Sequence, residues 1–104
     1  MSELSAPHLT NEARRYGVPE HCIGGLVAYI VQGRPVGDFL TALLSNDLMG
    51  ALRRADDVNM YALHAYGRFL HNAAPYSCYG SADAVAKWLK MHSEKRKELS
   101  ENGS

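Results

Sequence analysis

The 104-residue chain is poor in the residues that mark the most easily recognised classes of protein. It has two cysteines and one tryptophan, and its 11 basic residues balance 11 acidic ones, so the formal net charge is zero. A neutral chain has no overall field to hold it on nucleic acid or an anionic membrane. Its longest apolar run, residues 23–31, is about half a membrane span. A disulfide scaffold, a strongly basic nucleic-acid binder and a transmembrane protein are therefore not favoured.

What remains is ordinary globular composition, with 46% hydrophobic and 21% charged residues. A chain of this length suits one compact domain, because two halves would each be too small for a normal core. We expect a flexible N-terminal segment over residues 1–17, a single helical domain over residues 18–93 and a frayed charged tail over residues 94–104.

The apolar positions recur with helical spacing and never alternate long enough for a strand. Ile23, Leu26, Val27 and Ile30 predict a helix from about residue 19 to Gln32, which Gly33 ends. Further helices are expected over residues 37–56, with a break at 45–47, over residues 57–74, and from residue 81 onward. The sequence predicts an all-α fold, a compact bundle of four or five short helices with frayed termini.

One polar stripe is the main candidate for binding chemistry. Its members follow one another at steps of four, three, four and three residues, which places them on one side of the expected helix over 57–74. They are Asp57, Tyr61, His64, Arg68 and His71. Tyr61, His64, Arg68 and His71 are residue types that can hold a phosphate or a nucleotide, or transfer protons as acids and bases. The alternative is that the stripe is the solvent-facing side of an amphipathic helix.

Catalytic and metal-binding signatures do not occur in the sequence. There is no Cys-x-x-Cys, no His-Glu-x-x-His, no Gly-x-Ser-x-Gly and no glycine-rich phosphate loop. We therefore predict a protein that is not an enzyme, with no metal and no cofactor. Cys22 and Cys78 are expected to be reduced thiols, because no export signal accompanies them.

Two features suggest contact surfaces. Gly24 and Gly67 lie inside expected helices, where alanine would be more stable, so we expect close helix crossings or a symmetric interface there. Tyr76 and Tyr79 follow Pro75 in a short connection, and amphipathic aromatic side chains are common at protein interfaces. Lys87, Lys90, Lys95, Arg96 and Lys97 are mixed with acidic residues, which weakens the case for a nucleic-acid partner.

Short segments between Val18 and Trp88 form a recognisable pattern. They are residues 18–21 (VPEH), 33–40 (GRPVGDFL), 45–48 (SNDL), 55–56 (AD), Asn59, 74–75 (AP), 78–81 (CYGS) and Trp88. In this pattern the chain resembles small proteins encoded by tailed phages and prophages of Gram-negative bacteria. That group offers no catalytic residues to transfer to this sequence.

The resemblance implies an accessory protein that acts in the host cell cytoplasm by stoichiometric binding. It favours a counter-defence inhibitor, similar in its action to anti-CRISPR proteins, with a host bacterial protein complex as its partner. One alternative is an oligomer that binds or sequesters a small nucleotide through Tyr61, His64, Arg68 and His71. The other is a structural or regulatory phage protein that forms a homo-oligomer, with Gly24 and Gly67 at its interface.

Overall fold

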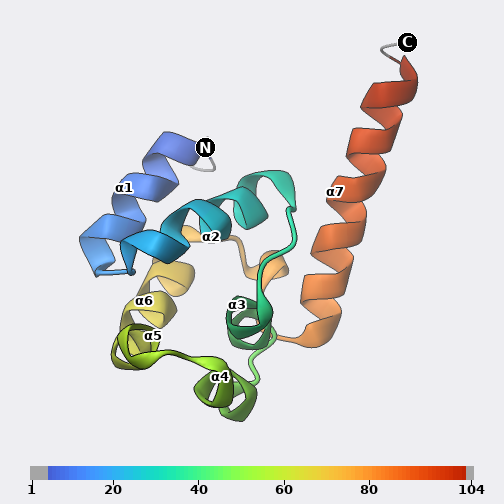
Figure 1. Ribbon diagram of the computed structural model, residues 1–104. Helices are drawn as coiled ribbons and strands as arrows, with labels where there is room; N and C mark the ends of the chain where they lie inside the picture. The colour runs from blue at the N-terminus through green and yellow to red at the C-terminus, as the bar shows by residue number, and fades with distance from the viewer. Residues whose placement is uncertain (1–4, 103–104) are drawn as a thin grey trace.

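The computed structural model describes residues 5–102, and these residues form helices and connecting segments with no β-strand (Figure 1). The elements are α1 (Ala6–Tyr16), α2 (Glu20–Gln32), α3 (Asp38–Leu44), α4 (Leu48–Arg54), α5 (Asp57–Tyr61), α6 (Leu63–Ala73), the 3₁₀ turn η1 (Tyr76–Cys78) and α7 (Ala82–Asn102). The predicted all-α fold is confirmed. The expected number of helices was too low, because the described residues contain seven.

The predicted capping signals define several helix ends. Gly33 ends α2 in the left-handed conformation, with a φ of 66°, and its N–H donates to the Tyr29 carbonyl at 2.9 Å. The break expected at residues 45–47 is confirmed, since α3 ends at Leu44 and α4 begins at Leu48. The Asp47 carboxylate caps α4 by accepting a hydrogen bond from the Gly50 N–H at 3.0 Å.

The helix expected over residues 57–74 is in fact two helices. Ala62 separates α5 from α6 with a φ of −101° and a ψ of 8°. Its N–H donates to the Asn59 carbonyl at 3.2 Å, which is the tighter bonding pattern of a 3₁₀ turn. The expectation of one helix was wrong because no glycine or proline marks this break.

The two ends of the chain also differ from the expected boundaries. Residues 6–16 of the expected flexible segment form α1, and Leu9 and Ala13 of this helix are buried in the core. The packed part of the chain therefore begins before residue 18. At the other end, α7 continues to Asn102 through most of the expected tail. Residues 1–4 and 103–104 lie outside the described residues.

Two side-chain hydrogen bonds and one ring contact hold the core together across the chain. The Tyr29 hydroxyl donates to the Cys78 carbonyl at 2.6 Å, and the Trp88 indole donates to the Tyr29 carbonyl at 2.9 Å. These bonds join α2 to η1 and to α7. Tyr66 packs edge-to-face on Phe39 with ring centroids 5.5 Å apart, which joins α6 to α3. Figure 1 shows α7 along one side of this core, with its C-terminal half extending past it.

Within the described residues, no close helix crossing occurs at Gly24 or Gly67, where one was expected. Both glycines are exposed, and a Cβ at either position would meet no atom within 4 Å. The expected crossing was wrong because helix propensity alone does not show which side of a helix faces the core. A symmetric interface at these glycines stays a prediction.

Gly24→Ala is therefore expected to stabilise the monomer. Alanine fits the open space, and it raises helix propensity by about 0.5–1 kcal/mol relative to glycine. Urea unfolding should show this gain, while the matched variant Gly50→Ala should gain less, because its Cβ would displace the Asp47 carboxylate from its cap of α4. A loss of stability in Gly24→Ala that depends on protein concentration would instead place Gly24 at an interface.

Candidate functional site

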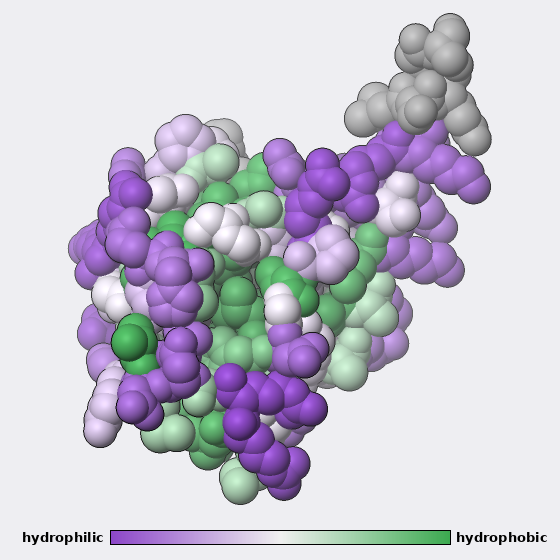
Figure 2. All heavy atoms as spheres, in the orientation of Figure 1, coloured by the Kyte–Doolittle hydropathy of each residue, from purple (hydrophilic) through white to green (hydrophobic). Residues whose placement is uncertain are grey.

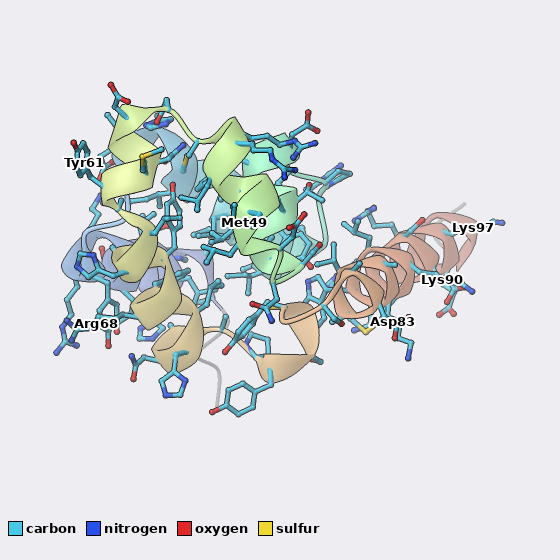
Figure 3. The ribbon with its side chains drawn as sticks, turned by 90° about the horizontal axis from the view of Figure 1, so that it is seen from below. Met49, Tyr61, Arg68, Asp83, Lys90 and Lys97 are labelled. Carbon is cyan, nitrogen blue, oxygen red and sulfur yellow. The ribbon has the colours of Figure 1, made fainter. Side chains whose placement is uncertain are left out.

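The predicted polar stripe lies on the outside of α5 and α6. Asp57 and Tyr61 belong to α5, whereas His64, Arg68 and His71 belong to α6, and all five side chains are exposed. The Arg68 guanidinium lies over the ring of Tyr16, 5.5 Å from its centroid. Tyr61 and Arg68 project outward along one edge of the molecule (Figure 3). None of the five residues lines the cavity between α2, α3 and α5 or the cavity between α2 and α7.

The two tyrosines expected at an interface lie next to each other. Their ring centroids are 6.3 Å apart, and the centroid of the Tyr76 ring lies 6.5 Å from that of His71. Tyr76 is 73% exposed, while Tyr79 is half-buried against the core. Gly24 and Gly67 lie on α2 and α6, away from this pair in the chain. The pair can contribute aromatic contact area to a binding partner.

A cavity of about 490 Å³ opens between α2, α3 and α5. Figure 2 shows it as a hollow with apolar side chains at its floor and hydrophilic ones around its rim. Its lining residues are His21, Cys22, Gly25, Pro35, Val36, Gly37, Asp38, Phe39, Leu40, Asp56 and Asn59. We call it the α2–α5 cavity. Apolar pockets with a few polar groups are the usual form of binding sites.

A buried hydrogen-bond network lies beneath the α2–α5 cavity. Asn59 is the buried polar residue of the described chain, and only 6% of it is exposed. Its Oδ1 accepts hydrogen bonds from the Tyr66 hydroxyl at 2.6 Å and the Cys22 thiol at 3.6 Å. Burial, and secondarily the Cys22 thiol, raises the pKa of Tyr66, so its hydroxyl remains a donor at neutral pH. This network fixes α2, α5 and α6 against one another.

The rim of the α2–α5 cavity is acidic. Asp56 caps α5 through its Oδ1, which accepts from the Asn59 N–H at 2.8 Å, and its Oδ2 lies 3.8 Å from His21 Nε2. Asp38, the first residue of α3, is the second acidic residue that lines the cavity. No lysine or arginine of the described chain lines it. The rim therefore favours a ligand that brings positive charge next to an apolar group.

Large apolar side chains are exposed on α4 and on α5, the helix whose Asn59 lines this cavity. Leu48 and Met49 of α4 and Val58, Met60 and Tyr61 of α5 are each at least 42% exposed. We call these five residues the α4–α5 apolar surface. Figure 3 shows Met49 on the outside of α4. Exposed methionine, aromatic and aliphatic side chains are enriched at protein-binding surfaces.

The two cysteines have different environments, and both are free thiols. Cys78 is fully buried, and burial raises the pKa of its thiol to about 12, so it stays protonated at neutral pH. Cys22 is half-buried under the α2–α5 cavity. Within the described residues, no three histidine, cysteine or acidic side chains come together in a way that could hold a metal ion.

The sequence analysis predicted binding by polar residues on a helix surface and did not predict the α2–α5 cavity. Asn59 belongs to the pattern found in the sequence, but nothing near it in the chain marks it as the centre of a network with Cys22 and Tyr66. Of the helices in the described part of the chain, none has the length and apolar character needed to cross a membrane.

Comparison with known proteins gives no further assignment. No protein-family model, no curated protein and no solved structure matches this chain. The function of the protein is therefore inferred from its own surfaces and cavities.

Proposed function

We propose that the protein acts by stoichiometric binding of another protein through the α4–α5 apolar surface and the adjacent α2–α5 cavity. The observation that carries this proposal is that five of the seven large apolar side chains left exposed in the described chain fall within residues 48–61. Their exposure to water costs free energy that a bound partner would recover. A pocket beside such a surface can receive one anchoring side chain of that partner.

The charges at the α2–α5 cavity indicate the partner's chemistry. Asp38 and Asp56 stand at the rim, and no basic side chain of the described residues lines the cavity. A complementary partner presents an apolar side chain flanked by arginine or lysine, since like charges would be repelled. The resemblance to phage-encoded proteins supports a host bacterial protein complex as that partner. The proposed role is counter-defence, in which the bound protein blocks the complex without any reaction.

Met49→Asp and Val58→Asp are expected to weaken partner binding at least tenfold each. Both side chains are more than half exposed, so a carboxylate there leaves the fold unchanged but would be desolvated in the complex. The matched control is Met91→Asp, an exposed methionine on α7 outside the surface. Tagged wild type and the three variants are expressed in a Gram-negative host, and captured proteins are identified by mass spectrometry.

A true partner is retained by wild type and Met91→Asp and lost by the other two variants, and its affinity is then measured with purified components. Partner activity should fall with added protein and saturate at a fixed stoichiometric ratio. Retention by all variants would contradict the proposed surface. A bound nucleotide that is lost in Arg68→Ala would instead support the nucleotide-binding alternative. A homo-oligomer with no captured protein would support the self-associating phage protein.

A further inference from the structure

A second cavity, of about 390 Å³, lies where α7 passes the C-terminal end of α2. It is lined by Val31, Gln32, Arg34, His92, Lys95 and Arg96. We call it the α2–α7 cavity. Three of its six lining residues are lysine or arginine and none is acidic, and hydrophilic side chains gather in this region in Figure 2. It is separate from the α4–α5 apolar surface and shares no residue with the α2–α5 cavity.

Gln32 holds two guanidinium groups of this cavity in place. Its side-chain oxygen accepts from Arg34 Nε at 3.4 Å, and its backbone carbonyl accepts from Arg96 Nη1. A cation at the end of α2 is favourable because the last carbonyls of a helix carry partial negative charge. That effect also favours Arg34, which lies two residues beyond the end of α2. It does not explain why Lys95 joins the two guanidinium groups around one cavity.

The acidic side chains that the structure describes do not neutralise these three cations. Among the described residues, Arg34, Lys95 and Arg96 form no ion pair with a carboxylate. Glu94 and Glu98 belong to the same helix but do not line the cavity. Bringing three positive charges together costs free energy, and a bound anion would offset that cost.

His92 forms a fixed wall of the cavity. Its side chain occupies the space that a Cβ on Gly33 would fill, and its ring lies 4.8 Å from that of Trp88. Within the described residues, His92 Nε2 is the buried side-chain polar atom that lacks a hydrogen-bond partner. Burial, followed by the charges of Lys95 and Arg96, lowers the pKa of His92. The imidazole therefore responds to any change in charge at this site.

We propose that the α2–α7 cavity binds the phosphate group of a small phosphate-bearing ligand. A phosphate monoester carries nearly two negative charges at pH 7 and three acceptor oxygens, which match two guanidinium groups and an ammonium group. Arginine is suited to phosphate because its planar N–H groups bind two oxygens at once. Val31 and the His92 ring give the cavity an apolar side that can contact the rest of the ligand.

The test is a titration of the full chain at pH 7 and constant ionic strength with inorganic phosphate and, separately, with adenosine monophosphate. Backbone N–H NMR signals of residues 31–34 and 92–96 should shift and saturate. Arg34→Gln and Lys95→Gln should each weaken binding about tenfold, since each removes one charged contact. The matched controls Arg53→Gln and Lys90→Gln remove charges elsewhere on the surface and should bind like wild type.

Tighter binding of adenosine monophosphate than of phosphate would identify a nucleotide as the source of the phosphate group, and equal binding would identify free phosphate. A bound phosphate should also raise the pKa of His92 toward its ordinary value, because it offsets the charges of Arg34, Lys95 and Arg96. Equal weakening in the control variants, or acetate binding as tightly as phosphate, would overturn the proposal. Because the α4–α5 apolar surface is untouched, this result is independent of partner binding.

Discussion

Asn59→Ala is expected to lower the free energy of unfolding by about 2 kcal/mol or more. The side chain is buried, and its removal leaves the Tyr66 hydroxyl without the acceptor that it contacts at 2.6 Å. A buried hydroxyl that loses its partner keeps its full desolvation cost. The cap of α5 should survive, because Asp56 accepts from the backbone N–H of residue 59. Urea unfolding of wild type and variant measures the difference.

Asn72→Ala is the matched control, since the Asn72 amide donates to the Arg68 carbonyl on the exposed side of α6. Its cost should stay within about 0.5 kcal/mol. Tyr66→Phe should cost less than Asn59→Ala, and the double variant should cost less than the sum of the two, because they share one hydrogen bond. Equal losses in Asn59→Ala and Asn72→Ala would show that the network contributes nothing to stability.

The parts of the fold that follow from local sequence were predictable. Gly33 and the cap at Asp47 act within a few residues of the helix ends that they define, so the limits of α2 and the break before α4 could be read directly. The all-α class follows from the same helical periodicity, because no segment of the sequence has the alternation of a strand.

The parts that depend on tertiary contacts were not predictable. α1 buries only Leu9 and Ala13, too few positions for a clear apolar stripe, although Ser5 caps it by accepting from the His8 N–H. The break at Ala62 has no glycine or proline to mark it. The same limit applies to glycines, because Gly24 and Gly67 turn out to be exposed while Gly33 is buried against α7.

The two cavities could not be predicted for the same reason, because each forms between segments that are far apart in the sequence. His21 and Asp56 are 35 positions apart in the numbering, yet both line the α2–α5 cavity. Gln32 and Arg96 are separated by 64 positions and are hydrogen-bonded at the α2–α7 cavity. Periodicity assigns a residue to a side of its own helix and cannot show which other helix it meets. The polar stripe was visible in the sequence because it lies along neighbouring helices in the chain.

Gly33→Ala is expected to lower the free energy of unfolding by about 2–4 kcal/mol, more than alanine at Gly17 or Gly24. Two effects combine at this position. The φ of 66° costs a non-glycine residue about 1 kcal/mol, and the added Cβ would overlap the His92 side chain. Because the overlap includes the Cβ of His92, which is fixed to the backbone of α7, it is relieved only by moving α7 or unwinding the end of α2.

Gly17→Ala separates the two effects. Gly17 also has a positive φ, of 92°, but a Cβ there would lie 3.8 Å from Ala65, an ordinary contact. Its loss should be about 1 kcal/mol, and the excess in Gly33→Ala measures how tightly α7 packs on α2. That excess should be accompanied by weaker phosphate binding, because displacing His92 and α7 moves Lys95 and Arg96 away from Arg34. Equal losses of stability in the two variants would mean that α7 moves away from Gly33 at little cost in free energy. The contact between Gly33 and His92 would then not hold the α2–α7 cavity rigid.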